Sequence, residues 1–273
     1  MLADEFNGFF DTKISKLKAG IETAAQNVMP PSDISTPINC SLQSFDAVST
    51  EHIGKIILDS KSATCDLDPL PTWILKKDLI VDTISPLITY IFNSSISSSC
   101  VPESLKYALV TPILKKSSLD QQIFKNYRPV SKLPFLEKVL EKVISCQIRD
   151  YLVKNNLHDP LQSAYKHGHS TETALLKIKT DIDLALDKNH GVNLVLLDLS
   201  AAFDTVSHDI LFKRLENIGI KGSALDWITS YLSNRIQQVQ INGIVSKPKP
   251  ISARFSTWTF VVPDICSSFR IAN

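Results

Sequence analysis

The sequence predicts an α+β protein in which a helical N-terminal region precedes a mixed region of helices and short strands. Apolar residues recur at helical spacing through the N-terminal third of the chain. Two short apolar runs, 107–114 and 192–197, are typical of strands. An Asn242-Gly243 pair between two further short runs indicates a β-hairpin.

The composition is that of an ordinary globular protein of one or two domains: 273 residues, 44% hydrophobic and 21% charged, with a net charge of +1. Any basic groove must therefore come from local clustering. The 5 cysteines are widely spaced and include no C-x-x-C pair, which argues against a disulfide framework and a zinc site. The sequence contains no run of about 18 apolar residues and no basic N-terminal leader. We therefore expect a nuclear or cytoplasmic protein, not a secreted one, without a membrane partner.

Residues 2–23 predict an amphipathic helix with Lys13, Lys16 and Lys18 opposite its apolar stripe. This basic face either contacts phosphate or is simply solvated, and the second alternative is favoured for so short a cluster. The Pro- and Ser-rich residues 29–42 are typical of a linker.

Helices and one strand are expected up to residue 115. A helix begins at Thr50, Pro71 suits the first position of a short helix, and a longer helix covers about 85–97. The strand 107–114 contains Pro112, which predicts an edge position because proline cannot donate to a ladder.

Arg128 is the first candidate binding residue. It precedes Pro129, so its backbone is biased towards an extended conformation. An extended Arg on a hairpin can reach a phosphate with its bidentate guanidinium, although a surface salt bridge is the commoner use of such a residue. Residues 136–151 then repeat apolar side chains at helical spacing and predict a core helix.

Lys166 is the second candidate. Ser170 or Thr171 can cap the helix that follows, and Lys166, a turn at Gly168 and the free N–H groups of that helix end together suggest an anion site. We expect this helix to close near Gly191.

Asp198 ends the apolar run 192–197, which we expect to be a strand buried on both faces. A carboxylate at the exposed end of a buried strand is well placed to meet a ligand. The alternative is that Asp198 simply caps a turn or a helix. Two helices, beginning near Ser207 and Lys221, and the 235–245 hairpin follow.

Several separate segments resemble the reverse transcriptases of non-LTR (LINE-type) retrotransposons. Residues 196–206, Leu-Leu-Asp-Leu-Ser-Ala-Ala-Phe-Asp-Thr-Val, are similar to the first carboxylate motif of that family. Residues 126–131 and 161–173 look like its two fingers motifs, and residues 64–73 and 101–116 look like the stretch before its core. The resemblance extends over roughly residues 60–250.

The resemblance implies a right-hand polymerase fold and RNA-directed DNA synthesis. It implies that Asp198 and the carbonyl of Leu199 bind catalytic Mg²⁺, and that Phe203 excludes the ribose 2′-OH. It also implies that Arg128 and Lys166 contact template or incoming nucleotide, although the family usually has Arg where Lys166 stands. The implied partners are an RNA template, a DNA primer and a dNTP.

The resemblance stops near the C-terminus. Two-metal chemistry needs more than one carboxylate, and the family supplies an adjacent Asp pair on a later hairpin. Past Asp204 the acidic residues are Asp209, Glu216, Asp226 and Asp264, none of them adjacent. We therefore expect a polymerase truncated after the first carboxylate motif and inactive as it stands. The alternative is a non-catalytic nucleic-acid-binding or scaffold protein derived from a decayed element.

The expected organisation has four parts. Residues 1–45 form an N-terminal helix and linker, and residues 46–115 a helical pre-domain. Residues 116–250 form a partial reverse transcriptase domain with fingers and an incomplete palm. Residues 251–273 are a divergent tail.

Overall fold

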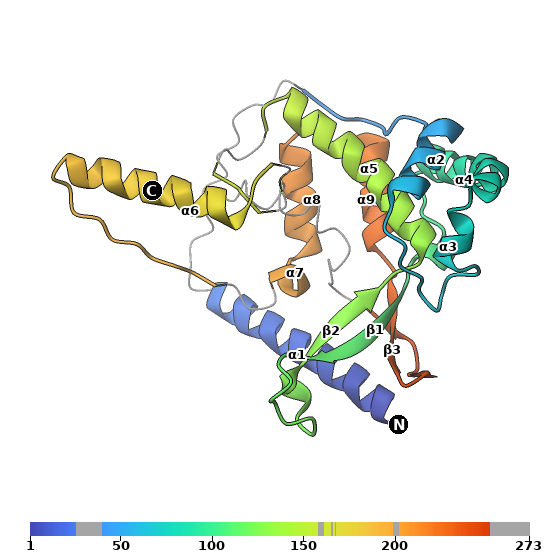
Figure 1. Ribbon diagram of the computed structural model, residues 1–273, viewed down its shortest axis with the longest axis horizontal. Coiled ribbons are helices and arrows are strands. Elements are labelled where there is room, and N and C mark those ends of the chain that lie inside the picture. Colours follow the sequence, from blue (N-terminus) through green and yellow to red (C-terminus); the bar gives the residue numbers. More distant parts are fainter. Residues whose placement is uncertain (26–39, 158–160, 165, 167, 199–201, 252–273) are drawn as a thin grey trace.

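The computed structural model describes residues 1–25, 40–157, 161–164, 166, 168–198 and 202–251. A helical core and a small mixed sheet lie next to each other, with one long helix along the sheet and another projecting away (Figure 1). The mixture of helices and a small sheet agrees with the predicted α+β class.

Helix α1 (Leu2–Ala25) packs along the sheet. Phe6 and Phe10 are buried against Val110 and Val239 of two neighbouring strands, which confirms the amphipathic prediction. A polar contact holds the same helix, because the buried Asn7 amide donates to Ser246 Oγ at 3.0 Å and accepts from Gln237 Nε2 at 2.9 Å. Burying these amides is tolerable because each one is hydrogen-bonded.

The helical core is formed by α2 (Thr50–Asp59), α3 (Thr72–Leu75), α4 (Asp78–Ser98) and α5 (Phe135–Lys154), with α8 (His208–Asn217) and α9 (Gly222–Leu232). The Thr50 start and the α5 core helix are confirmed. Helix α4 begins earlier than predicted and contains Pro86. Burial of its apolar side, including Ile88 and Phe92, compensates for the hydrogen bond that Pro86 cannot donate.

Among the described residues, α4 is the one helix long and apolar enough to cross a membrane by length and composition. Core helices pass the same test, and Val81, Ile88 and Ile96 of α4 lie in the helical core. We therefore assign α4 a packing role.

The sheet has the order β2-β1-β3-β4, with β5 (Lys249–Pro250) also paired to β3. Strand β1 (Tyr107–Leu114) runs antiparallel to β2 (Tyr127–Lys132) and parallel to β3 (Ile236–Ile241). Short 3₁₀ helices, η1 (Glu103–Leu105) and η2 (Phe124–Asn126), precede β1 and β2.

The predicted edge position of the 107–114 strand holds only for its second half. Strand β3 pairs with Tyr107–Val110, so this half of β1 is interior. Beyond Val110, β2 is the one described strand that pairs with β1. In this half of β1, Pro112 faces Pro129. Two facing prolines have no N–H groups to exchange, so the pair suits a non-hydrogen-bonded position.

Residues 192–197 do not form the buried strand that we expected. They have no regular secondary structure and are exposed. A strand needs a neighbour for its backbone hydrogen bonds, and residues 192–197 pair with none of the described strands. Asp198 therefore does not sit at the end of a sheet strand.

Helix α6 (Thr171–Asp187) begins at the predicted cap, Ser170. The residue that ends it in the left-handed conformation is Asn189, with φ 59°, and not Gly191 as expected. The His190 N–H then donates to the Ala185 carbonyl at 2.9 Å and reverses the chain.

Two of the remaining helices and the hairpin follow the predictions. The short helix α7 (Ala202–Thr205) contacts α1, and α8 and α9 lie where two helices were expected. Strands β3 and β4 (Ile244–Val245) form the predicted hairpin. Positive φ at Asn242 (49°) and Gly243 (80°) matches the primed turn that such a pair favours.

Candidate functional site

Asp198 lies in an exposed segment without regular structure, directly after residues 192–197. Leu199, its predicted metal-binding neighbour, lies outside the described residues. Phe203 belongs to α7 by its backbone, but its side chain also lies outside the description. The predicted relationship between Asp198, Leu199 and Phe203 therefore stays a prediction.

Lys166 is half-buried in the loop before α6. The His169 N–H donates to the Lys166 carbonyl at 3.2 Å, which forms the predicted turn. Ser170 Oγ accepts the Thr173 N–H at 3.2 Å, and the Thr173 hydroxyl oxygen accepts the Ser170 N–H at 2.9 Å. This capping box uses one of the free N–H groups of the helix end.

Arg128 is exposed on β2, as the extended prediction required. It faces Ile113 across the hairpin. Residues two apart on a strand share a face, so Arg128 and Lys115 project from the same face of the hairpin. The Lys115 ammonium also donates to the Lys125 carbonyl at 2.8 Å, which holds the start of η2 against the end of β1.

Four cations, from α1, η2, β2 and the residue directly after β1, gather at this end of the sheet. We call Lys13, Lys115, Lys125 and Arg128 the basic cluster. Partial burial, together with the nearby charges of Lys13, Arg128 and Lys125, lowers the pKa of Lys115. Lys13 comes from α1, so the helix along the sheet adds its charge to the β1–β2 hairpin.

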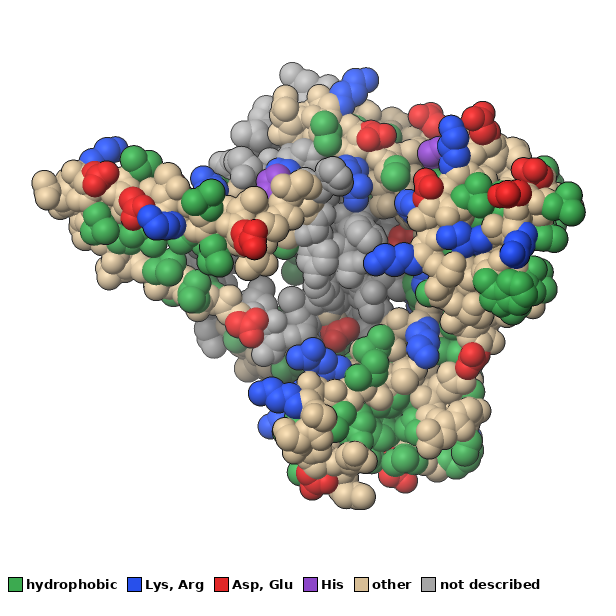
Figure 2. Space-filling model, viewed as in Figure 1, with side chains coloured by type: hydrophobic (Ala, Val, Ile, Leu, Met, Phe, Trp, Pro, Cys, Tyr) green, Lys and Arg blue, Asp and Glu red, His purple; other side chains and the backbone are tan. Residues whose placement is uncertain are grey.

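The basic cluster has no acidic counterpart in the described part of the chain. Lys115, Lys125 and Arg128 are exposed and Lys13 is half-buried, and none of the four forms an ion pair there. Figure 2 shows Lys and Arg side chains on the face that carries α1 and the hairpin. Gathering like charges costs free energy, and a polyanion that neutralises them recovers it. The cluster is therefore suited to bind phosphates.

The described residues do not fit a complete Mg²⁺ site. No three His, Cys, Asp or Glu side chains gather within the described ranges. Mg²⁺ prefers oxygen ligands in an octahedron and is commonly held by one or two carboxylates plus substrate phosphates. Asp198 is one carboxylate, and the two-metal arrangement needs more. Members of the reverse transcriptase family use divalent metal ions, and Asp198 is one carboxylate that could hold such an ion.

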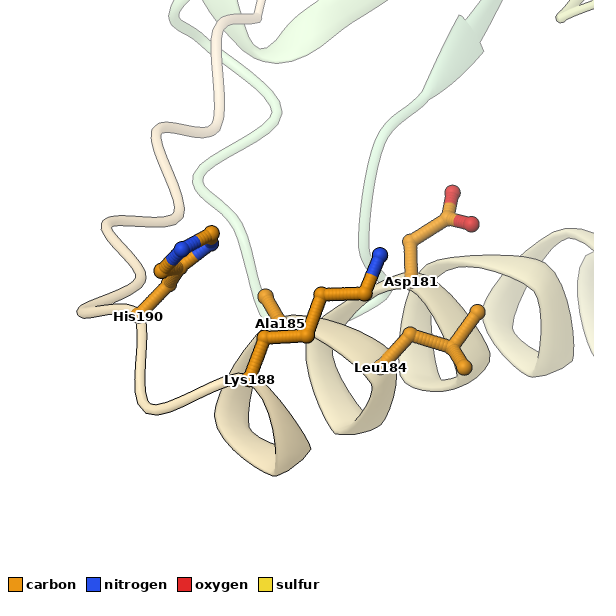
Figure 3. A pocket seen from close by; sticks show the side chains of 5 residues that line it. All are labelled: Asp181, Leu184, Ala185, Lys188 and His190. Atoms are coloured by element: carbon orange, nitrogen blue, oxygen red, sulfur yellow. The ribbon is translucent and has the colours of Figure 1, made fainter.

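An open depression lies at the end of α6, away from the predicted residues. Asp181, Leu184, Ala185 and Lys188 line it from the helix, and His190 lines it from the loop beyond (Figure 3). One carboxylate and one imidazole do not make a metal or catalytic set there.

No hydrogen bond or ion pair between described residues joins Arg128, Lys166 and Asp198, so the structure does not bring the three together by direct contact.

The comparison with known families gives a match over residues 113–256, just over half of the chain. The matched family is described as reverse transcriptase (RNA-dependent DNA polymerase). The matched range contains Arg128, Lys166, Asp198 and Phe203.

Similar proteins come from mobile elements. The chain is 26% identical to "RNA-directed DNA polymerase from mobile element jockey" of Drosophila funebris. The similar region of 249 residues covers 90% of the chain and 26% of that protein. The chain is also 25% identical to "Probable RNA-directed DNA polymerase from transposon BS" of Drosophila melanogaster. Here the similar region of 182 residues covers 67% of the chain and 20% of that protein. These matches agree with the resemblance to non-LTR reverse transcriptases. The chain spans about a quarter or less of the length of these relatives.

Proposed function

The chain belongs to the reverse transcriptase (RNA-dependent DNA polymerase) family, and on this basis we propose that it forms the fingers and the beginning of the palm of an RNA-directed DNA polymerase from a non-LTR retrotransposon. In this proposal the basic cluster and Lys166 contact an RNA template, a DNA primer or a dNTP through their phosphates. Asp198 and the Leu199 carbonyl are the ligands for Mg²⁺, and Phe203 lies against the sugar of the incoming nucleotide.

We further propose that the 273 residues by themselves bind nucleic acid without extending a primer. The proposal of nucleic-acid binding rests on the basic cluster, because four cations, three of them exposed, lie together without an acidic partner in the described ranges. The proposal that the chain does not extend a primer rests on Asp198, because within the described ranges it belongs to no group of three or more potential metal ligands, and two-metal chemistry needs several carboxylates.

Binding is tested by titrating a fluorescent single-stranded RNA with the protein in EDTA over a range of NaCl concentrations. The test variant replaces Lys13, Lys115 and Arg128 with Gln. The matched control replaces Lys55, Lys177 and Lys179, which pair with Glu51, Asp181 and Asp183. Both variants lose three positive charges, so a general charge effect would weaken them equally.

We expect the test variant to lose affinity by at least about tenfold at low salt, and the control variant by much less. Equal losses in the two variants, or salt-independent binding, would refute the assignment of the basic cluster to nucleic acid.

A primer-extension assay tests the proposal that the chain does not extend a primer. The protein receives an RNA template, an annealed DNA primer, dNTPs and Mg²⁺, with Asp198→Ala as the comparison. We expect no product from either protein. Extension by the wild type that Asp198→Ala abolishes would show that the missing carboxylates are supplied elsewhere, and the proposal of inactivity would be wrong.

A further inference from the structure

The loop that joins β1 to β2, residues 115–126, carries two members of the basic cluster and borders a third. We call it the tip loop. Lys115 begins it, Lys125 lies near its end, and Arg128 follows on β2. Hairpin loops usually have about 2–5 residues, whereas this one is longer and contains neither Gly nor Pro. A long loop that carries like charges keeps one conformation only where further contacts hold it.

The base of the tip loop is fixed by a backbone hydrogen bond and by helix α1. The Lys115 N–H donates to the Asn126 carbonyl at 2.9 Å and closes the loop. The Phe6 ring of α1 lies 4.3 Å from the Phe124 ring and 5.0 Å from the Tyr127 ring, measured between ring centres. The loop accordingly lies beside α1 (Figure 1). These contacts hold the two ends of the loop, and its middle needs contacts of its own.

Two side chains near the start of β2 hold the middle of the tip loop. Asn126 Nδ2 donates to the Asp120 carbonyl at 2.8 Å, and the Tyr127 hydroxyl donates to the Gln121 carbonyl at 3.1 Å. The Gln122 N–H donates to Asp120 Oδ1 at 2.8 Å and folds the same turn. Two successive carbonyls of the loop are therefore tied to two successive residues that lead directly to Arg128.

We propose that Asn126, together with Tyr127, is a positioning residue that keeps the tip loop ordered, so that Lys115, Lys125 and Arg128 meet the phosphates of one nucleic-acid strand together. The proposal rests on the assignment of the basic cluster to nucleic acid. A surface that is ordered in advance loses less conformational entropy on binding. When only a fraction of the molecules has the binding conformation, the apparent affinity falls by that fraction, while the contacts in the complex stay the same.

This relationship separates positioning from direct contact. Loss of a cation that contacts phosphate lowers the affinity for single-stranded RNA, and it also lowers the slope of log affinity against log salt by about 0.7 per contact. Loss of a positioning residue lowers the affinity at an unchanged slope, because the complex keeps all its ion pairs. Asn126 and Tyr127 carry no charge at neutral pH, so the two effects can be measured separately.

The test is a titration of fluorescent single-stranded RNA with the full chain at several NaCl concentrations. Asn126→Ala should bind about fivefold more weakly, as expected for one lost hydrogen bond, with the slope of the wild type. Lys115→Gln should lower both the affinity and the slope. The matched control is Asn155→Ala, because Asn155 Nδ2 donates to the Tyr151 carbonyl at 2.8 Å at the end of α5. It loses the same kind of bond outside the tip loop and should bind as the wild type does.

A second variant and a second measurement make the test independent of one substitution. Tyr127→Phe removes the hydroxyl but keeps the ring, and it should weaken binding by about two- to fivefold at an unchanged slope. Tyr90→Phe on α4 is its control, since Tyr90 is 72% exposed. In hydrogen exchange, the N–H groups of residues 115–126 should exchange faster in Asn126→Ala than in the wild type and regain protection when RNA is added.

Three results would overturn the positioning role while the basic cluster still binds RNA. They are wild-type affinity in both Asn126→Ala and Tyr127→Phe, a slope in Asn126→Ala as low as that of Lys115→Gln, and hydrogen exchange of the tip loop that Asn126→Ala leaves unchanged. A wild-type chain without affinity for RNA would refute the nucleic-acid assignment and the positioning role together, and this result is recognised in the unmodified protein.

Discussion

The Arg235 guanidinium donates to Glu137 Oε1 in the interior and joins the start of β3 to the first turn of α5. The two side chains are 4% and 0% exposed. Arg235 Nη1 also donates to the Tyr231 carbonyl at 3.2 Å, and the Tyr231 hydroxyl donates to the same Glu137 oxygen at 3.3 Å. The guanidinium lies 4.8 Å from the centre of the Tyr231 ring. This ion pair ties the helical core to the sheet.

Arg235→Met should destabilise the protein by about 3–5 kcal/mol, because it leaves the Glu137 carboxylate buried without its partner. The measurement is urea unfolding followed by circular dichroism. The double variant Arg235→Met, Glu137→Met should regain much of the loss, since neither charge is then buried alone. An unchanged unfolding midpoint in the single variant would contradict the ion pair.

Glu141, one helical turn after Glu137, gives a prediction about pH. Burial raises the pKa of Glu137 to about 7 against the opposing effect of Arg235, and burial together with the charge of Glu137 raises the pKa of Glu141. A raised folded-state pKa adds stability below the unfolded pKa, and this stability is lost as the pH rises through the folded pKa. The two glutamates should therefore make the protein less stable at about pH 8 than at about pH 5.

Glu141→Gln should remove part of this pH dependence, because the amide stays neutral. We expect the variant to be more stable than the wild type by about 1–3 kcal/mol at about pH 8, and no more stable at about pH 5. The measurement is urea unfolding at both pH values. Glu172→Gln, at an exposed position in the first turn of α6, is the control and should show no such difference. If Glu141→Gln raised the free energy of unfolding by the same amount at both pH values, the raised pKa of Glu141 would be contradicted.

Gly219 lies in a conformation and a space that only glycine tolerates. Its φ is +89°, and a Cβ there would come within 2.4 Å of the Cys40 carbonyl oxygen and of the Tyr151 hydroxyl. Gly219→Ala should therefore cost about 2–5 kcal/mol from backbone strain and overpacking. Gly20→Ala in α1, where nothing lies within 4 Å, should instead stabilise by about 0.5–1 kcal/mol. Thermal unfolding of the two variants measures both changes in stability. Destabilisation of equal size in each variant would contradict the special role of Gly219.

Lys13 tests whether α1 shares in the basic cluster. If Lys13 contacts phosphate, Lys13→Gln should lower the slope of log affinity against log salt for single-stranded RNA by about 0.7. Lys55→Gln, which breaks an exposed pair with Glu51, should leave the slope unchanged. The slopes of both variants are measured by fluorescence anisotropy titrations of the RNA at several salt concentrations. An unchanged slope for Lys13→Gln would confine the binding surface to the hairpin.

Local patterns determined most of the elements. The apolar period of residues 2–23 and of α5, the Ser170 cap and the Asn242-Gly243 turn each depend on residues close in sequence, and all of them are confirmed. The short segments around Arg128, Lys166 and Asp198 also identified the family, because the type and spacing of residues are properties of the chain itself. The metal role of Asp198 and the domain boundaries stay predictions.

Tertiary structure alone decided the features that need distant partners. The run 192–197 has strand composition, but a strand also needs a neighbour, and this run pairs with none of the described strands. The basic cluster joins residues 13, 115, 125 and 128, and the buried Arg235–Glu137 pair spans 98 positions. The sequence by itself determined the family and the local helices and turns, whereas burial, pairing and charge clustering arise from contacts between segments whose approach no local pattern encodes.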